Sequence, residues 1–337
     1  MILRPIQKSD YAALVTIADE SGHGFTSLPN NEELLQKKIA HSVNSFTKTT
    51  SQPGDEGYLF VLEDTETGEV VGTSGIEAAV GLDDAFYHYH LSKVIHSSRT
   101  LDVYKAVDIL TLCNDYTGAT ELCTLFLKDG YRKNYNGKLL SKARFMFIKQ
   151  HQQRFAQTVI AEMRGVSDEN GSSPFWQWLE EHFFSMDFPT ADYLTGIGQK
   201  VFIAELMPKY PIYVNLLSKD AQAVIGQVHD NTRPAIQLLK SEGFTFNGYV
   251  DIFDAGPTVE AKVDNIATIR NAQNFSVEIG EMTGDTMVLL ANDKLEDFRA
   301  TVAPMAFDSR SNSLVLTQEL ADALHLKSGD FVTATPV

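Results

Sequence analysis

The spacing of apolar and polar residues predicts a chain that mixes strands and helices from its first residues. A short apolar run at 2–6 predicts a strand. The periodic segment from Tyr11 to Ala18, which follows the capping candidates Ser9 and Asp10, predicts a helix. The chain therefore opens as a strand followed by a helix.

The middle of the chain predicts a strand, a loop and a long helix in that order. A helical stretch at 32–39 and an antiparallel hairpin at 58–73 come first. Residues 121–127 then form a nearly continuous apolar run, which indicates a strand buried on both faces. A polar loop at 128–137 separates this strand from a helix expected over 138–154.

The region from 158 onward predicts further strands and helices, and two of its segments have matching spacing. We expect strands at 158–163, 201–206 and 223–228, and helices that begin at Pro174, over 212–217 and over 234–242. Pro174, Leu179 and Phe184 are spaced like Pro234, Leu239 and Phe244, and each set follows an expected strand. An internal duplication fits this match, and so do two unrelated strand and helix units.

Short β-like runs dominate from about residue 265, at 286–290, 313–316 and after Asp330, with one helix near 318–324. The fold class predicted is α+β, with mixed central sheets flanked by helices and a small β-rich C-terminal region. We divide the chain into residues 1–200, 201–264 and 265–337.

Composition and charge narrow the classes of function. The chain has 337 residues, 43% of them hydrophobic, which is enough for a buried core. Its formal net charge of −16 argues against nucleic acids and anionic membranes as partners, because both require basic surface. The N-terminus lacks a secretory pattern and no run of about 18 apolar residues occurs, so we expect a cytoplasmic protein that handles small molecules.

Cys113 and Cys123 are too few for a disulfide framework and lack the spacing of a zinc site. We interpret both as reduced thiols, and we expect neither a metal nor a tightly bound cofactor.

The loop at 128–137 carries the first chemical signal. A loop that opens a helix offers free N–H groups and the positive end of the helix dipole, which suits a pyrophosphate. Arg132, Lys133 and Lys138 add positive charge there. A solvated basic surface is the competing interpretation.

The order of strand, helix, hairpin, buried strand, loop and helix resembles the GNAT acyltransferase superfamily. In that superfamily the loop holds the pyrophosphate of acyl-CoA and the preceding strand pairs with its pantetheine arm. Arg132 and Gly137 match the loop pattern, whereas Tyr135 stands where the first glycine is usual. The resemblance implies two tandem GNAT-like halves, residues 1–200 for acyl-CoA and 201–264 carrying His229.

A series of longer strings resembles the arginine N-succinyltransferase family over residues 1–265. These are LFL at 125–127, AEMRG at 161–165, SPFW at 173–176, FSMDF at 184–188, FIAELMP at 202–208, IGQVH at 225–229 and VDIFD at 250–254. The resemblance implies transfer of a succinyl group from the co-substrate succinyl-CoA to the α-amine of L-arginine, the first step of arginine catabolism by this route. It also implies a homo-oligomer or a paired-subunit assembly.

The same resemblance assigns roles to two residues: Leu125 contacts succinyl-CoA and His229 is the proton donor. Core packing is the competing role for Leu125, and capping of the helix at Pro234 is the competing role for His229. An imidazole titrates near neutrality and so can pass protons at physiological pH. We expect direct attack by the amine, without a covalent acyl-enzyme.

Two further residues are candidates for substrate recognition. Glu162 would bind the guanidinium group and Arg164 the succinyl carboxylate, because carboxylate and guanidinium pair through two hydrogen bonds. The alternative is that Glu162 and Arg164 pair with each other.

Two other functions remain open. One is an N-acyltransferase of the same fold with another acceptor, such as ornithine, or another acyl donor. The other is a non-catalytic subunit that binds acyl-CoA, which Tyr135 in the loop makes conceivable.

Overall fold

The computed structural model describes residues 1–21, 27–168, 171–199 and 201–337. Within these ranges the strands are β1 (Ile2–Pro5), β2 (Gly57–Glu63), β3 (Val70–Glu77), β4 (His88–Ser98), β5 (Val103–Cys113), β6 (Thr120–Leu127), β7 (Thr158–Glu162), β8 (Ile212–Tyr213), β9 (Thr245–Val250), β10 (Pro257–Lys262), β11 (Gln273–Ile279), β12 (Thr286–Ala291), β13 (Ala300–Met305), β14 (Ser313–Leu316) and β15 (Phe331–Pro336). The α-helices are α1 (Tyr11–Ser21), α2 (Glu32–Thr47), α3 (Asn136–Gln150), α4 (Pro174–Leu179), α5 (Phe188–Gly196), α6 (Val201–Leu206), α7 (Lys219–Val224), α8 (Arg233–Ser241), α9 (Ala267–Asn271) and α10 (Gln318–Ala323).

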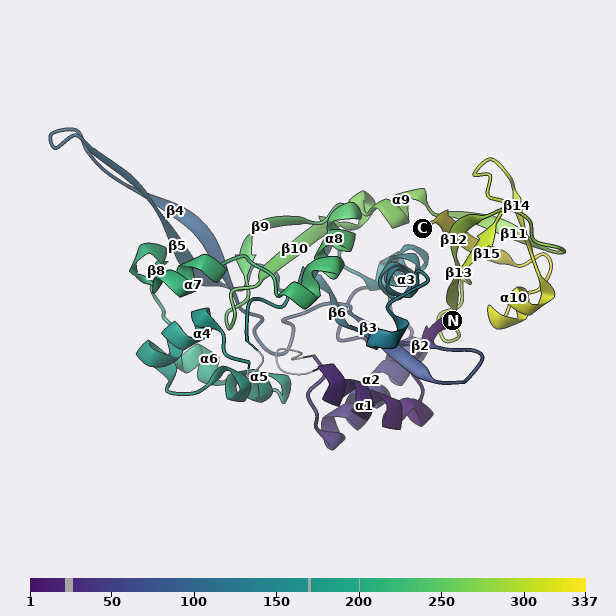
Figure 1. Cartoon of the computed structure of the whole chain (residues 1–337), viewed down its shortest axis with the longest axis horizontal. Coiled ribbons are helices and arrows are strands. Elements are labelled where there is room, and N and C mark those ends of the chain that lie inside the picture. The colour runs from purple at the N-terminus through teal and green to yellow at the C-terminus, as the bar shows by residue number, and fades with distance from the viewer. Residues whose placement is uncertain (22–26, 169–170, 200) are drawn as a thin grey trace.

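The strands follow one another in a single hydrogen-bonded order, β14-β11-β15-β12-β13-β1-β2-β3-β6-β7-β10-β9-β4-β5-β8. β6 with β7 and β11 with β14 are parallel, and the other neighbours in the described ranges are antiparallel. The mixed α/β fold with a β-rich C-terminal region is therefore confirmed (Figure 1).

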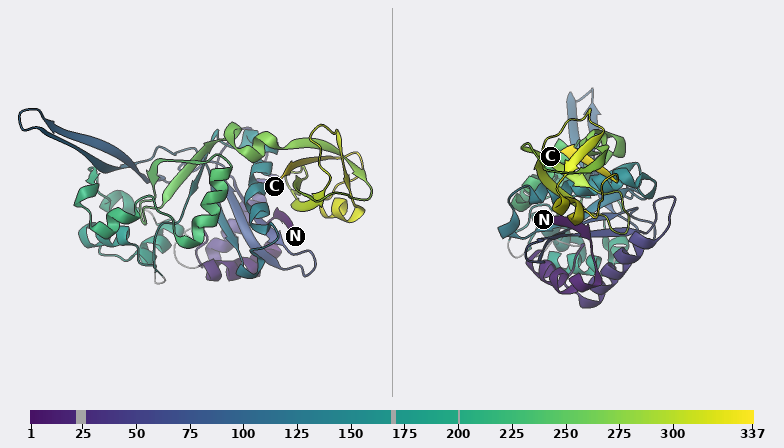
Figure 2. Two further views of the ribbon diagram at one scale, coloured as in Figure 1. Left: turned by 45° about the horizontal axis from the view of Figure 1, so that its top comes forward. Right: turned by 90° about the vertical axis from the view of Figure 1, so that its right-hand side faces the viewer.

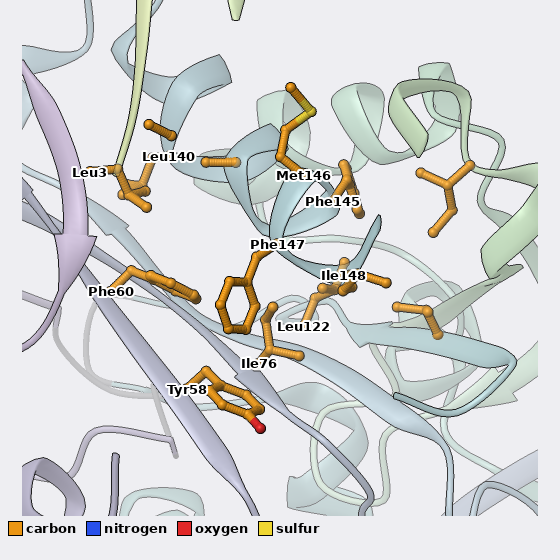
Figure 3. Packing of buried hydrophobic residues seen from close by; sticks show 14 of the residues in the cluster. Leu3, Tyr58, Phe60, Ile76, Leu122, Leu140, Phe145, Met146, Phe147 and Ile148 are labelled. Carbon is orange, nitrogen blue, oxygen red and sulfur yellow. The ribbon is translucent and has the colours of Figure 1, made fainter. Parts of the chain in front are cut away.

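Helices cover both faces of the sheet around β2 because its side chains alternate between the faces. Tyr58 and Phe60 share a core cluster with Phe147 of α3, whereas Leu59 shares a second cluster with Leu35 of α2. Figure 3 shows the Phe147 ring beside Phe60 and Tyr58, and its centroid lies 5.1 Å from each of theirs. The apolar face of α3 and its 15-residue length explain why the long helix was predictable.

The two ends of the molecule differ in construction. The β4–β5 hairpin projects beyond the helices α4 to α7 at one end, and the C-terminal strands form a compact β-rich body at the other (Figure 2). That body continues the sheet, since Leu3 of β1 is in register with Ala300 of β13. This hairpin lies within residues 81–117, for which the sequence analysis predicts no element.

Three predicted elements between 201 and 228 are wrong. Residues 201–206 form helix α6 rather than a strand, because Ile203 and Met207 are buried one helical turn apart. Residues 212–217 form the short strand β8 and a 3-10 turn rather than a helix. Residues 223–228 are the end of α7 and an irregular segment with Gly226 at φ +72°, rather than a strand.

The last of these corrections removes one support for the internal duplication, because Pro234 is not preceded by a strand as Pro174 is. The tandem arrangement and the boundaries at 200 and 264 stay predictions. Among the described residues, no helix has the length and apolar character needed to cross a membrane.

Candidate active site

The pairing of β6 with β7 is short, and a cavity opens where it ends. Thr120 is in register with Val159 and Glu121 with Ile160, and the described strands share no register beyond that point. The residues that follow, 122–126 and 161–164, line a cavity of about 810 Å³. Facing strand edges that no longer pair leave backbone donors and acceptors available to a ligand.

A β-bulge in β6 shapes this side of the cavity. Thr124 has φ +53°, and the register with β3 shifts between Thr73 and Gly75. The Thr73 hydroxyl donates to the Thr124 carbonyl at 3.0 Å. Gly75 permits the close approach, because a Cβ there would lie 3.0 Å from the Cys123 sulfur. Leu125 follows the bulge and lines the cavity, while its side chain also packs against the main core.

Side chains from both faces of the sheet reach the cavity. Leu122 and Ala161 belong to the core cluster on the α3 side. Glu121 and Glu162 neighbour them in sequence and therefore face the opposite side of the sheet. The cavity is thus lined from both faces of the sheet, with Leu122, Ala161 and Arg144 on the α3 side and Glu121 and Glu162 on the opposite side.

The loop after β6 brings positive charge to the cavity. Lys128, Asp129 and Arg132 are lining residues. Arg132 donates from Nε to the Leu127 carbonyl at 3.1 Å and forms an ion pair with Asp129 at 3.0 Å. The structure therefore places Arg132 at the cavity, and its role toward a pyrophosphate stays a prediction.

Gly137 and Tyr135 lie further along the loop. Gly137 is in the first turn of α3, outside the cavity lining, and faces open space. Tyr135 is the N-cap of α3 with φ +65°, a conformation that glycine adopts without strain. Its ring is 42% exposed and the Lys138 ammonium lies 5.2 Å from its centroid. Tyr135 is not a lining residue, so its ring does not narrow the cavity.

A buried histidine lies behind Glu162. Nε2 of His88 is 2.9 Å from Oε1 of Glu162, and the His88 ring is fully buried. Burial lowers the pKa of His88 to about 4, so the ring is neutral at physiological pH. The Glu162 side chain is 28% exposed and lines the cavity.

Glu121 is the second carboxylate at the base of the cavity. Burial raises its pKa to about 8, and the like charges of Glu162 and Glu77 act in the same direction. Lys38 and His88 oppose the shift. A carboxyl group that titrates near neutral pH inside a cavity is a candidate for proton transfer.

Asp254 fixes the segment that leaves β7. Its carboxylate accepts hydrogen bonds from the backbone N–H groups of Gly165 at 2.6 Å and Gly256 at 2.8 Å. A Cβ at Gly256 would lie 2.1 Å from the Met163 carbonyl, and a Cβ at Gly165 would collide with Asp254. This packing explains the glycine in the AEMRG string and holds Arg164 at the cavity wall.

Arg164 has unused donor capacity in the cavity wall. Its guanidinium donates to the Ser167 hydroxyl at 3.0 Å, while its buried Nε finds no hydrogen-bond partner among the described residues. Burial lowers the pKa of Arg164, against the effect of Asp254 and Asp192. A guanidinium with a free, desolvated N–H is suited to binding a carboxylate.

Arg144 of α3 is a second buried cation at the cavity. It donates to the carbonyl and hydroxyl oxygens of Ser141 at 3.1 Å and lies 3.5 Å from the carbonyls of Gly75 and Cys123. Burial lowers the pKa of Arg144 to about 10, so it remains charged at neutral pH.

His229 sits beside the cavity but not at the end of a strand, which corrects the predicted context. Its backbone N–H donates to the Arg164 carbonyl at 2.9 Å, and its Nδ1 accepts from the Asn231 N–H at 3.2 Å. His229 thereby caps the 3-10 turn at 230–232, whose residues Asn231 and Thr232 line the cavity. Burial and Arg164 lower the pKa of His229. With Nδ1 as acceptor, the neutral ring carries its hydrogen on Nε2.

The cysteines offer no evident nucleophile. Both are free, and burial raises the pKa of Cys123 to about 12, which disfavours its thiolate. Among the described His, Cys, Asp and Glu side chains, no group is arranged to hold a metal ion.

Sequence reasoning missed Glu121, Arg144 and Asp254. Glu121 is the charged residue in an otherwise apolar strand, and Arg144 stands in the apolar segment of α3. Charged residues in buried elements are uncommon, so these positions were detectable as exceptions to the pattern. Asp254 gave no such signal, because its partners lie about 90 residues away or within a turn.

Comparison with known proteins gives concordant matches over the whole chain. The family described as arginine N-succinyltransferase beta subunit matches residues 1–268, and its C-terminal domain matches residues 273–336. Arginine N-succinyltransferases of Salmonella schwarzengrund and Salmonella agona are each 49% identical over 333 residues, 98% of this chain and 96% of theirs. The solved structure of arginine/ornithine succinyltransferase subunit AI from Pseudomonas aeruginosa superposes with a TM-score of 0.92 at 36% identity, covering 99% of this chain and 98% of that one.

Proposed function

Because the chain belongs to the arginine N-succinyltransferase family, we propose that it transfers a succinyl group from succinyl-CoA to the α-amine of L-arginine. The products are N2-succinyl-L-arginine and CoA, and the reaction begins arginine catabolism by the succinyltransferase route. Succinyl-CoA is a co-substrate, and no tightly bound cofactor is required.

One observation carries the proposal: the cavity between β6 and β7 combines carboxylates with guanidinium groups. Glu121 and Glu162 are on one side, while Arg132, Arg144 and Arg164 supply positive charge. Arginine is a cation that needs carboxylate partners, and succinyl-CoA carries phosphates and a carboxylate that need cations. A single cavity with both kinds of group supports a reaction between these two substrates.

The donor is assigned to the β6 edge and the loop after it. Leu125 lies just beyond the bulge, where its backbone can hydrogen-bond the pantetheine arm or the thioester oxygen. Arg132 supplies charge for the pyrophosphate, and Gly137 lets the first turn of α3 approach it without a side chain.

The acceptor and the succinyl carboxylate are assigned to β7 and the residues after it. Glu162 binds the guanidinium of arginine, supported by its carboxylate chemistry and its place in the cavity lining. Arg164 binds the succinyl carboxylate, supported by its buried, unpartnered Nε. Arg164 donates to the Ser167 hydroxyl, and no ion pair joins it to Glu162 among the described residues.

The reaction is direct aminolysis. The neutral α-amine attacks the thioester carbonyl, the tetrahedral oxyanion is stabilised by backbone N–H groups near Leu125, and His229 protonates the departing CoA sulfur. The backbone hydrogen bond between His229 and Arg164 supports a site where the leaving sulfur and the succinyl carboxylate are close together.

The test is CoA release by the purified chain with combinations of succinyl-CoA or acetyl-CoA and arginine, ornithine or lysine. We expect the largest kcat/KM with succinyl-CoA and arginine, and N2-succinylarginine as the product by mass spectrometry. A preference for ornithine or for acetyl-CoA would reassign the substrates within the same fold. No CoA release with any pair, together with retained succinyl-CoA binding, would indicate a non-catalytic binding subunit.

Cytoplasmic location and a homo-oligomeric state complete the proposal. The oligomeric state is supported by the matched family and the solved structure, each of which is described as a subunit. Gel filtration with light scattering of the purified chain tests the oligomeric state.

A further inference from the structure

We propose that two copies of this chain pair through their β4–β5 hairpins, with the tip of each hairpin on the base of the other. The outer part of the hairpin, residues 91–109, is called the arm below. The inference rests on the homo-oligomeric state proposed above and adds the surface that forms it.

The arm is a two-stranded ribbon with little support from the rest of its own chain. β4 and β5 pair along all their residues, but within the described ranges β4 pairs with β9 only at Tyr89 and His90, and β5 pairs with β8 only at Ile109 and Leu110. None of residues 91–109 is buried, and the arm extends past the helices in Figure 1. An isolated two-stranded hairpin is only marginally stable in water, so a covering partner would stabilise the arm.

One face of the arm continues an apolar core outward. Leu110 of β5 is fully buried in the core cluster that includes α4 to α7, and Leu91, two residues beyond Tyr89 on β4 and opposite Leu110, packs against that cluster. Side chains alternate along a strand, so Ile95 and Tyr104 share this face further out. Ile95 is 46% exposed and Tyr104 is 73% exposed. The apolar face therefore extends beyond the helices that cover its inner part.

The tip and the base of the arm are both apolar and exposed. Leu101, in the turn between the two strands, is as exposed as Tyr104 beside it. At the base, β8 pairs with β5, and β8 is flanked by Tyr210 and Leu216, which are 87% and 72% exposed. Exposed apolar groups gathered at one end of a molecule indicate a protein contact. Two arms that lie antiparallel about a two-fold axis bring each tip to the other base.

The distribution of charge favours a second copy as the partner. The whole chain has a net charge of −16, so two copies repel each other over most of their surface. The hairpin at 88–113 departs from this average, with three basic and two acidic residues. Residues 174–224, which form the end of the molecule at its base, have six acidic and three basic residues. Contact between a hairpin and this end therefore joins opposite net charges.

The positive charge lies where the contact needs it. Lys93 forms an ion pair with Asp108 inside the arm. Arg99 and Lys105 lie further out, next to the apolar residues of the tip. An apolar tip flanked by cations is complementary to an apolar base in an acidic region.

The experiment measures self-association of the purified chain by sedimentation equilibrium. We expect wild type to have the mass of two chains of 37.4 kDa, or a multiple of two. The tip variant carries Leu101→Glu and Tyr104→Glu, and the base variant carries Tyr210→Glu and Leu216→Glu. In each variant the Kd for self-association should rise at least about 100-fold, the scale of losing two central contacts of an interface.

The matched control carries Val315→Glu and Phe331→Glu. Both residues are exposed apolar positions on strands, in the C-terminal body at the other end of the molecule. The control should keep the wild-type Kd. All three variants should keep the far-UV circular dichroism of wild type, because every substituted side chain is exposed in the single chain.

An equimolar mixture of the tip and base variants tests which parts meet. In a mixed dimer, the intact tip of the base variant meets the intact base of the tip variant, so one of the two contacts is that of wild type. We expect mixed dimers at concentrations where neither variant associates alone.

The arm is excluded as the contact if the folded tip or base variant keeps the wild-type Kd, if the control dissociates as well, or if the mixture forms no dimers. A monomeric wild type, including one that associates only with a different subunit, would instead contradict the homo-oligomeric state itself. The two failures are therefore distinguishable.

Discussion

At the scale of single residues, His229 makes a structural contact and is also the residue that we propose as the proton donor. Its Nδ1 caps the turn at 230–232 and its backbone is bonded to Arg164. The observed cap lies on this turn and not on the helix at Pro234, whose N-cap is Thr232. A substitution can separate the cap from the proposed proton transfer.

His229→Asn should keep the cap and lose the proton transfer, because the asparagine oxygen can accept the Asn231 N–H in place of Nδ1. We expect an unchanged melting temperature and a kcat about 100-fold lower, measured by thermal unfolding and CoA release. His229→Ala is the comparison, and it should also lose about 1 kcal/mol of stability with the cap. Wild-type kcat in His229→Asn would show that the ring serves only the fold.

Arg164 is the residue whose substitution should change the choice of acyl donor. Loss of a charge-assisted bond costs about 1.5 to 3 kcal/mol, so Arg164→Gln should lower kcat/KM for succinyl-CoA about 10- to 100-fold. The rate with acetyl-CoA, which has no carboxylate, should be unaffected.

The control is Arg154→Gln, since Arg154 is also an arginine in the interior but binds the Tyr58 hydroxyl and the Lys48 carbonyl. It should reduce stability and leave the ratio of the two donors unchanged. An unchanged ratio in Arg164→Gln as well would exclude Arg164 from carboxylate recognition.

At the scale of elements, the entrance to α3 contains backbone strain that the sequence only hinted at. Asn134 and Tyr135 both have positive φ, at +51° and +65°. Asparagine tolerates this conformation and tyrosine does not. Tyrosine in place of the usual loop glycine therefore strains the backbone at position 135. It does not narrow the cavity, because Tyr135 is not a lining residue.

Tyr135→Gly should stabilise the protein. Relief of the left-handed conformation gains about 1 to 2 kcal/mol, of which roughly 0.5 to 1 is offset by the greater entropy of glycine in the unfolded chain. We expect a net rise in the melting temperature of roughly 2 °C. Asn134→Gly should show a smaller change, and an equal or larger rise in that control would contradict the explanation.

At the scale of the whole molecule, the C-terminal body and the main core share side chains. Phe298 is fully buried, and its ring centroid lies 5.1 Å from that of Phe147 and 5.7 Å from that of Phe60. Phe275 is equally buried but belongs to the separate cluster of the C-terminal strands, against Phe307. This arrangement predicts cooperative unfolding of both parts.

Phe298→Ala and Phe275→Ala should each cost about 3 to 5 kcal/mol, the usual cost of truncating a buried phenylalanine. Because the parts share a core and a strand pairing, both variants should lower the temperature of one common transition in scanning calorimetry. A second transition that moves only in Phe275→Ala would show that the C-terminal body unfolds independently.

The sequence by itself determined the elements whose patterns are local and strong. The apolar run at β6, the long helix α3, the hairpin of β2 and β3 and the C-terminal strands β12, β14 and β15 were predicted, because each has a periodicity or a turn that is recognisable locally. The C-terminal strands β11 and β13 were not predicted. It also placed Arg132, Glu162 and Arg164 near the cavity by their positions at strand ends and in the loop. Short apolar runs such as 201–206 were ambiguous, since a buried helix and a strand look alike over six residues.

Only the tertiary structure decided what these elements make together. The end of the β6–β7 pairing, the bulge at Thr124 and the approach of Gly256 to Met163 depend on residues far apart in the chain. So does the basicity of Glu121, because it arises from burial and from charges on four other elements. A local sequence pattern indicates whether a residue is buried or exposed. The pKa of a group and the shape of a cavity depend instead on distances between residues that are far apart in the sequence.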